Sequence, residues 1–325
     1  MISNVTTKIW NVHLKPYFFR RACFRKKGRI ENWLKEKQGT IQICPIDLGL
    51  SETNSECNNI KAGAYLYLNG FKTYPANWRD YAIYFQPTAA ILDLGRFSDF
   101  DDYARAVSRN SRGNDNRSVK KALRLGYRTC VIDQDAYKAS IDRIRRSKVV
   151  RTGGLMFDAI RPKANLVDGG EQVVGPPRCG VHWSMCWGAF KGKTLVAYAL
   201  LTRCGNVIRT IHIMGHRDAL GDGVIKLLVF DIVRWLFAPE SASLRGIRYF
   251  MYGALEHGGE GLFEWKLRLQ FHPSLPDMKM VFGNILPSGF DETTYLELNP
   301  DVKKAKVDAR LHYMVWGRLE GRRYS

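Results

Sequence analysis

The sequence predicts an α+β fold in which a central mixed β-sheet is flanked by helices. The chain has 325 residues, of which 45% are hydrophobic and 12% aromatic, so it can bury a sizeable core. Segments rich in β-branched apolar residues alternate with segments of helical periodicity. The central run covers residues 194–273, where two strands, a glycine turn, a long helix, another strand and a glycine-rich helix start follow one another.

Short strands are predicted before the first helix. Strand-like segments cover residues 40–43, 64–68, 81–85 and 89–94. Asn69 and Gly70 form a turn signal after the second of these segments. Ser98 or Asp99 can then cap a helix that extends into Ala106.

A basic region follows this helix start. Residues 101–150 hold thirteen Lys or Arg and six Asp, a local charge of +7. The predicted elements are a helix around residues 117–124, a strand over residues 126–133 and a helix over residues 136–148. The last helix carries Arg143, Arg145 and Arg146. These cations could contact CoA phosphates or a tRNA acceptor stem, or they could simply form solvated helix faces.

A long irregular segment separates this region from the central run. Residues 151–180 are rich in Gly and Pro, as lids and substrate loops often are. A hairpin is predicted around Lys191, Gly192 and Lys193. The elements expected around and after it are strands over residues 181–190, 195–201 and 207–214, a helix over residues 224–237, a strand over residues 246–253, a helix within residues 258–273 and a last strand over residues 278–282.

The chain divides into three predicted parts. Residues 1–63 form a basic, aromatic N-terminal arm and a polar loop, residues 64–285 form the central domain, and residues 286–325 form a small C-terminal helical module. Residues 1–38 hold ten Lys or Arg and two Glu, a local charge of +8, with aromatic residues among the cations. Such an arm could stack on RNA bases, bind an anionic membrane surface or pack on the protein itself.

The whole chain carries a net charge of +19, which favours polyanionic partners. Coenzyme phosphates, RNA, anionic membranes and acidic glycans all belong to this class, and a basic solubilising surface is the alternative. The sequence shows neither a secretory signal pattern nor an apolar run long enough to cross a membrane. We therefore expect a cytoplasmic protein, with a peripheral position at the inner membrane face as an alternative.

The seven cysteines are odd in number and scattered, as is typical of reduced thiols in a cytoplasmic protein. Cys179, His182 and Cys186 are close in sequence, but their spacing fits no zinc pattern. We therefore predict buried structural cysteines and no metal site.

The turn between residue 214 and the helix at Val224 is the first candidate binding site. Gly221, Asp222 and Gly223 lie where a strand passes through a glycine turn into a helix. Backbone N–H groups at the start of a helix point outward at the positive end of the helix dipole, so such a turn can bind phosphate.

Asp218 to Gly223 resembles the pyrophosphate-binding turn of the GNAT acyltransferase superfamily. The family pattern is Gln or Arg, two residues, Gly, one residue, then Gly or Ala; here Asp218 takes the first place and Arg217 lies one position earlier. The resemblance implies a GNAT-like sheet and an acyl-CoA substrate, acetyl-CoA first among them. The residues expected to contact it are Met214, Arg217, Gly221, Asp222 and Gly223.

Residues 258–273 resemble the closing helix of Fem-type aminoacyl and peptidyl transferases. In that family a lysine stands three residues before a Phe–Gly pair; Lys266 matches the lysine, while Leu269 and Gln270 replace the pair. The resemblance implies that Lys266 stabilises an oxyanion or protonates a leaving group, and the alternative is a surface lysine. As an order of elements the likeness covers residues 75–285.

Acyl transfer also needs a base for the attacking amine or hydroxyl. The candidates are His216, Glu256, His257 and Glu260, which lie at the ends of predicted core strands. We expect an acyltransferase that moves an acyl group from acyl-CoA to an amine or hydroxyl of a cell-surface glycan or peptide precursor. The alternatives are a Fem-type transferase that uses aminoacyl-tRNA, and a non-catalytic RNA-binding or membrane-binding protein on a degenerate GNAT scaffold.

Residues 290–322 resemble a short helical module appended to bacterial glycan-biosynthesis enzymes and to some secreted proteins. The matching elements are Tyr-Leu, Asn-Pro-Asp-Val, His-Tyr and Gly-x-x-Glu-Gly-Arg. We expect two helices that dock on the body of the protein, with His312 as a packing residue.

Overall fold

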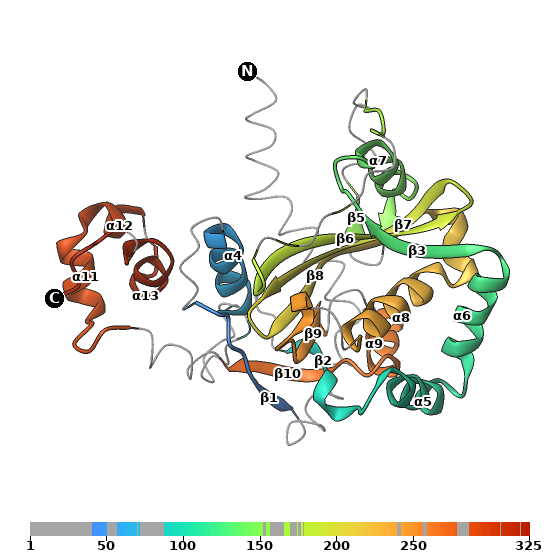
Figure 1. Cartoon of the computed structure of the whole chain (residues 1–325), viewed down its shortest axis with the longest axis horizontal. Coiled ribbons are helices and arrows are strands. Elements are labelled where there is room, and N and C mark those ends of the chain that lie inside the picture. Colours follow the sequence, from blue (N-terminus) through green and yellow to red (C-terminus); the bar gives the residue numbers. More distant parts are fainter. Residues whose placement is uncertain are drawn as a thin grey trace.

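The computed structural model shows a mixed α+β architecture around an eight-stranded sheet (Figure 1). The structure describes residues 41–50, 57–69, 71, 88–151, 154–156, 166–169, 174, 177, 179–238, 242–255, 259–277, 286–305, 307–318 and 320–325. The predicted arm over residues 1–38 and the strands predicted over residues 81–85 and 278–282 lie outside these ranges.

The strands of the large sheet follow the order β1-β10-β2-β9-β8-β7-β6-β3. Their bounds are β1 Gln42–Pro45, β2 Ala89–Asp93, β3 Tyr127–Ile132, β6 His182–Lys191, β7 Thr194–Cys204, β8 Val207–Gly215, β9 Tyr249–Ala254 and β10 His272–Asp277. Two pairs of this sheet, β1–β10 and β8–β9, are parallel, and its other pairs are antiparallel. A separate two-stranded ribbon joins β4 (Val150–Arg151) to β5 (Gly154–Leu155).

Helices cover both faces of the sheet (Figure 1). The bounds of those on the body are α4 Asn58–Asn69, α5 Phe100–Ser111, α6 Asn114–Arg124, α7 Lys138–Arg146, α8 Val224–Leu236 and α9 Gly259–Arg268. Helices α5, α6, α8 and α9 bury the largest apolar cluster against one face. Helices α4 and α7 pack on the other face and contribute to two smaller clusters. The core therefore lies in layers on the two sides of the sheet, as the sequence predicts for an α+β fold.

Local capping explains where the helix α5 begins. The Asp99 carboxylate accepts a hydrogen bond from the backbone N–H of Asp102 at 2.7 Å, so Asp99 is the N-cap of α5. The helix ends at Ser111, and its C-cap residue Arg112 has a left-handed φ of 50°. The predicted start near Asp99 is therefore confirmed.

The strand predicted over residues 64–68 is wrong, because these residues belong to α4. Tyr65 and Leu68 lie three positions apart and are both buried, as is Lys61 one turn earlier. The alternation of Tyr and Leu favours a strand, but burial follows the helical spacing of three and four residues.

Helix α9 lies within the range predicted for it. The helix stops at Arg268 and β10 begins at His272, so the last residues of that range belong to a strand. Gln270 takes the left-handed conformation, with φ of 68°. The N–H of Gln270 donates to Leu267 O and that of Phe271 to Lys266 O, both at 3.0 Å, which is the Schellman pattern of helix ends.

The C-terminal module has its own small core. Its helices are α11 Glu292–Leu298, α12 Pro300–Ala305 and α13 Ala309–His312, followed by a π-helical turn over Tyr313–Gly317. His312 Nδ1 lies 2.8 Å from the Tyr295 hydroxyl, and its ring packs 5.7 Å from that of Trp316. Arg318 donates to the Leu50 carbonyl at 3.2 Å. The module thus docks on the body, and the packing role predicted for His312 is confirmed. The prediction of two helices is wrong, because the Asn299–Pro300 and Val307–Asp308 steps divide the segment into three short helices.

Candidate functional site

Strands β8 and β9 run parallel but pair only at their beginnings. Toward β7, the register of β8 runs from Val207 to Gly215, whereas toward β9 it stops at the Arg209–Met251 pair. Beyond that pair β8 continues to Gly215 on β7, and β9 continues to Ala254 on β2. Parallel strands end at the same edge of a sheet, so the turns that follow β8 and β9 lie at one end of the fold.

An arginine and a tyrosine lie where this pairing stops. The guanidinium of Arg209 lies 4.3 Å from the centroid of the Tyr67 ring, which α4 supplies. The Arg209 Nε is buried without a hydrogen-bond partner among the residues that the structure describes. Burial lowers the pKa of Arg209, the cost expected for a cation taken from water. The sequence indicates Arg209 only as an interruption of an apolar strand, and it does not identify Tyr67.

The turn after β8 coils into a 3-10 helix over Arg217–Asp222, although the sequence predicts a loop. His216 closes its start, since its Nδ1 accepts the N–H of Asp218 at 3.5 Å. Arg217 and Asp218 are exposed. The candidate base His216 is therefore the N-cap residue of this 3-10 helix, and it is half-buried.

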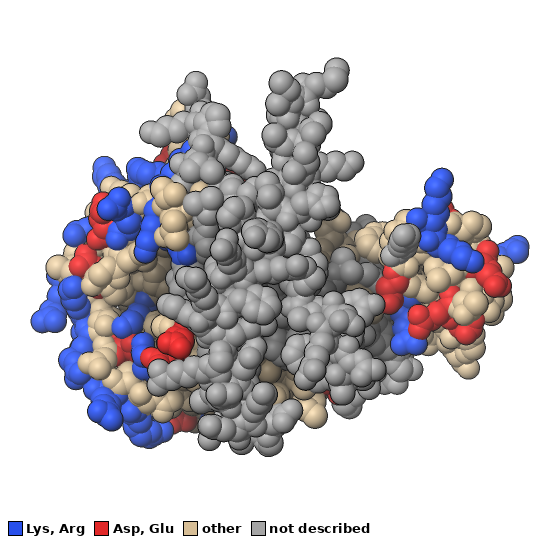
Figure 2. All heavy atoms as spheres, turned by 180° about the vertical axis from the view of Figure 1, so that it is seen from behind, with Lys and Arg blue, Asp and Glu red and all other residues tan. Residues whose placement is uncertain are grey.

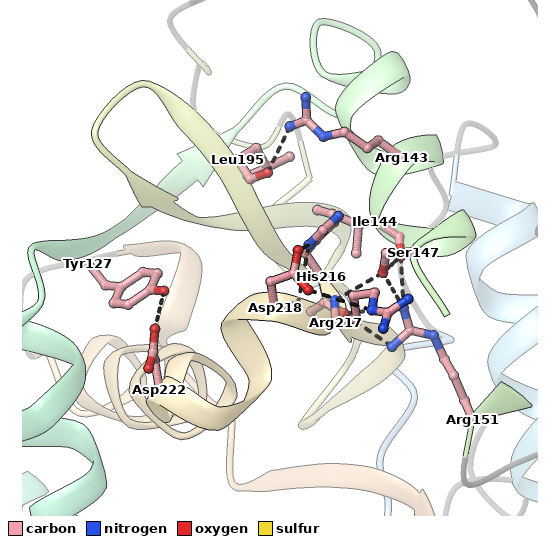
Figure 3. Close-up of polar contacts among 11 residues, drawn as sticks. Tyr127, Arg143, Ile144, Ser147, Arg151, Leu195, His216, Arg217, Asp218 and Asp222 are labelled. Carbon is pink, nitrogen blue, oxygen red and sulfur yellow. Dashed lines mark hydrogen bonds and ion pairs between the residues drawn. The ribbon is translucent and has the colours of Figure 1, made fainter. Parts of the chain in front are cut away.

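The Asp222 carboxylate turns toward β3 and α6. It accepts a hydrogen bond from the Tyr127 hydroxyl at 2.7 Å (Figure 3). It also lies 3.4 Å from Lys121 Nζ. The Tyr127 hydrogen bond and then Lys121 lower the pKa of Asp222. Lys121 Nζ also donates to the Gly221 carbonyl at 3.0 Å. The two contacts of Lys121, with the Asp222 carboxylate and the Gly221 carbonyl, connect the turn to the basic helix α6.

The two glycines of the turn have different surroundings. Gly223 has a φ of 85°, and a Cβ placed on it would lie 2.6 Å from the Ser118 carbonyl of α6. A Cβ on Gly221 would meet nothing within 4 Å among the described residues. Close packing therefore requires glycine at position 223, whereas the outer side of Gly221 is open.

Helix α7 holds the start of the turn from the other side. The Arg151 guanidinium donates to Ile144 O at 2.8 Å and to Gly215 O at 3.2 Å (Figure 3). Ser147 Oγ accepts the backbone N–H of Arg217 at 3.1 Å. The sequence does not predict these contacts, because the partners lie far apart in the chain and Arg151 opens a segment rich in Gly and Pro.

Met214, predicted to contact the cofactor, lies beneath α7. The Tyr198 hydroxyl lies 3.7 Å from its sulfur and accepts a hydrogen bond from Arg145 Nε at 2.8 Å. Arg145 also approaches His212 Nδ1 at 3.1 Å. Arg145 of α7 and Tyr198 of β7 thus contact His212 and Met214 near the end of β8.

Lys266 is buried, so the alternative of a surface lysine is wrong. Only 1% of it is exposed, and its ammonium donates to the carbonyls of Ala254 and Leu255 at the end of β9. It also lies 5.4 Å from the Tyr252 ring centroid. The ammonium therefore points at the connection between β9 and α9, where Glu256 and His257 lie outside the described residues. Glu260 stands half-buried in the first turn of α9.

Exposed cations form a strip that we call the basic edge. Figure 2 shows Lys and Arg gathered along the side of the molecule opposite the C-terminal module. The exposed Lys and Arg residues on α5, α6 and β3, together with the C-cap residue of α5, are Arg105, Arg109, Arg112, Arg117, Lys120, Lys121, Arg124 and Arg128. Three of them, with Leu123, line a shallow hollow on α6. Through Lys121 this edge reaches the turn after β8.

No helix in the part of the chain that the structure describes is long and apolar enough to cross a membrane. This finding agrees with the absence of a spanning run in the sequence.

Comparison with known proteins gives only distant matches. No protein-family description and no curated protein matches the sequence. Among solved structures, the chain is similar to the C-terminal domain of a candidate lysylphosphatidylglycerol synthetase from Agrobacterium fabrum, with 12% identity and a TM-score of 0.34. It is also similar to L-PGS from Bacillus licheniformis, with 13% identity and a TM-score of 0.36. Each match covers 57% of this chain and 57% of the other chain, and at this level it assigns no function.

Proposed function

We propose that this protein transfers an aminoacyl group from tRNA to an amine or hydroxyl of a cell-surface glycan or peptide precursor. The observation that carries the proposal is the basic edge, which leads along α6 to the turn after β8. A strip of cations with few compensating carboxylates suits a ligand with many phosphates better than a ligand with a few. The net charge of +19 agrees with such a donor.

The reaction would take place where β8 and β9 separate. The attacking nitrogen or oxygen forms a bond to the carbonyl carbon of the aminoacyl ester, and the bond from that carbon to the ribose oxygen breaks. The nucleophile gives up a proton and the ribose oxygen takes one up. His216 is our candidate for the base, since it lies at the mouth of the turn and is half-buried rather than enclosed.

Lys266 acts in this proposal as a positioning residue. Its ammonium holds the carbonyls of Ala254 and Leu255, so it fixes the direction in which the chain leaves β9. Glu256, His257 and Glu260 follow in the sequence and stay further candidates for the base. A Lys266→Met variant is expected to lower the rate of transfer more than the affinity for tRNA, because it moves the reacting end and leaves the basic edge intact.

The test compares two charge reversals of equal size. Lys120→Glu with Arg124→Glu alters the basic edge, and Lys303→Glu with Lys304→Glu makes the same change on exposed positions of the C-terminal module. Binding of labelled tRNA is measured by fluorescence anisotropy over a series of salt concentrations. We expect the first variant to bind tRNA about tenfold more weakly. The slope of the logarithm of its binding constant against the logarithm of the salt concentration should become shallower by about 0.9 for each duplex phosphate that is no longer neutralised. The second should resemble the wild type.

Equal weakening in both variants would indicate only non-specific attraction, and it would overturn the assignment of the basic edge. A direct assay follows the transfer of a radiolabelled amino acid from aminoacyl-tRNA to a mixture of precursor acceptors. Binding without transfer, with His216→Ala unchanged in every readout, would favour the non-catalytic RNA-binding alternative.

Acyl-CoA is the second candidate donor, and the open side of Gly221 is the observation that favours it. Calorimetric titration with acetyl-CoA tests it directly. Gly221→Ala should keep any binding and Gly221→Glu should abolish it, because only the second variant places a carboxylate where the pyrophosphate would lie. No heat of binding to the folded wild type would remove this candidate.

A further inference from the structure

Two cysteines and a histidine from distant parts of the chain meet in the interior. Cys57 immediately precedes α4, Cys179 lies shortly before β6, and His182 is the first residue of β6. Their Sγ atoms and one ring nitrogen lie within 4.8 Å of one another, and all three residues are buried. The sequence places Cys179, His182 and Cys186 close together, whereas in the fold Cys57 joins Cys179 and His182, and Cys186 is not part of the cluster.

The histidine is oriented as a metal ligand would be. Its Nε2 lies 2.7 Å from the Leu48 carbonyl oxygen, which can only accept a hydrogen bond, so Nε2 carries the proton. In the neutral ring the lone pair is then on Nδ1, which lies 3.7 Å from Cys179 Sγ. A metal-binding histidine ordinarily donates its other ring N–H to a carbonyl or carboxylate in this way.

The spacing of the donor atoms suits a tetrahedral ion. Zinc bonds of about 2.3 Å to sulfur and about 2.0 Å to nitrogen place a sulfur and a nitrogen ligand about 3.5 Å apart. The 3.7 Å between Cys179 Sγ and His182 Nδ1 is close to this separation. Two thiolates and a neutral imidazole also carry the charge that neutralises a divalent cation.

A further cysteine nearby is bound differently. Cys204 Sγ donates to the Leu48 carbonyl at 3.3 Å, so its thiol proton is engaged on the oxygen that also accepts from His182. Cys204 therefore stands beside the cluster as a hydrogen-bond donor and is not part of the donor set.

We propose that Cys57, Cys179 and His182 bind one zinc ion through two thiolates and Nδ1. Three protein donors leave the fourth tetrahedral position for a water molecule or another donor. The ion would join the start of α4 to the start of β6, two elements that belong to different apolar clusters. Its role is structural: it fixes the layer that carries Tyr67 against the sheet.

Metal content of the full-length protein tests the site. The chain, purified without added metal and dialysed, is analysed by plasma mass spectrometry together with Cys179→Ser and a matched Cys130→Ser. Cys130 is half-buried on β3 and lies outside the cluster. We expect about one zinc per chain in the wild type and in Cys130→Ser, and a nearly complete loss in Cys179→Ser. Equal zinc in the two variants, or none in the wild type, would overturn the proposal.

A second measurement does not depend on the folding of a variant. Cobalt titrated into the reduced, metal-stripped wild type should produce thiolate-to-cobalt charge-transfer absorption and the intense visible bands of a tetrahedral site. Thiol counting separates metal binding from a disulfide: denatured protein prepared without reductant should show all seven thiols. A count that is two thiols short, with Cys57 and Cys179 joined, would replace the metal site by a disulfide.

Discussion

Strand β8 has two neighbours that hold it in different ways. It pairs with β7 along its whole length, from Val207 opposite Cys204 to Gly215 opposite Ala197. With β9 it pairs only as far as Arg209. Most of β7 is buried, whereas every residue from 209 to 214 of β8 is half-buried. The ladder with β7 reaches both ends of β8, with one register shift between Leu200 and Leu201, whereas the end of the ladder with β9 gives polar groups a place to approach β8 from outside the core.

The largest expected effect tests whether the turn after β8 is held by packing. Gly223→Ala should destabilise the protein by about 2–3 kcal/mol, because it combines a left-handed backbone with a clash against Ser118 O. Gly221→Ala should change the stability by less than about 0.5 kcal/mol. Denaturant unfolding followed by circular dichroism measures both. Similar destabilisation in the two variants would show that packing does not distinguish the glycines.

A second test concerns the end of β9. Lys266→Met keeps most of the length of the side chain but leaves the carbonyls of Ala254 and Leu255 without their donor. We expect a decrease of about 1–3 kcal/mol in the free energy of unfolding. Lys193→Met, on the exposed tip of the β6–β7 hairpin, is the matched control and should be nearly neutral. A neutral Lys266→Met would mean that water replaces the ammonium there.

The pH dependence of stability tests the burial of His272, the first residue of β10. Burial, and then the charge of Arg96, lower the pKa of His272 to about 4. The folded state therefore resists a proton that the unfolded chain accepts below about pH 6.5, so stability decreases as the pH falls from about 6.5 to about 4. His272 is partly exposed, so we expect a decrease of about 1–2 kcal/mol over this range. His272→Phe should flatten the profile; an unchanged profile would assign the dependence to other groups.

The smallest expected effect lies at the end of α9. Gln270→Gly should stabilise the protein by about 0.5–1 kcal/mol, because glycine adopts the left-handed conformation without the steric cost that glutamine carries. Thermal and denaturant unfolding detect a change of this size. A destabilised variant would show that the Gln270 side chain, which is 7% exposed, makes packing contacts that outweigh the strain.

The strands and helices of the central run can be predicted because their patterns are local. The β-branched run of β8 and the helical spacing of Val224 and Leu228 in α8 are visible without knowledge of the fold. The helix over residues 58–69 is not apparent in the sequence, because its Tyr and Leu residues alternate over a short stretch while their burial follows the turns of a helix. A local sequence pattern does not show which face of a segment will pack against the sheet, because that depends on the rest of the fold.

The candidate site is predicted only as a set of turns. The sequence indicates His216, Gly221 and Lys266, but the clamp of Arg151 on Gly215 and the stack of Arg209 on Tyr67 depend on contacts between distant segments. The burial of Lys266 likewise depends on a distant contact, the hydrogen bond from its ammonium to the Ala254 carbonyl at the end of β9. The left-handed backbone at position 270 has no local signal in the sequence, because residues other than glycine rarely adopt this conformation.

The Arg151 clamp has a mechanical consequence. One guanidinium joins a carbonyl near the end of α7 to the last carbonyl of β8, and Ser147 of the same segment holds the amide of Arg217. A shift of α7 would therefore reach the start of the turn through the side chains of Arg151 and Ser147. Lys138, Arg143 and Lys148 are exposed on α7 and just after it. A polyanion that binds these cations and displaces α7 would therefore also displace Gly215 at the end of β8.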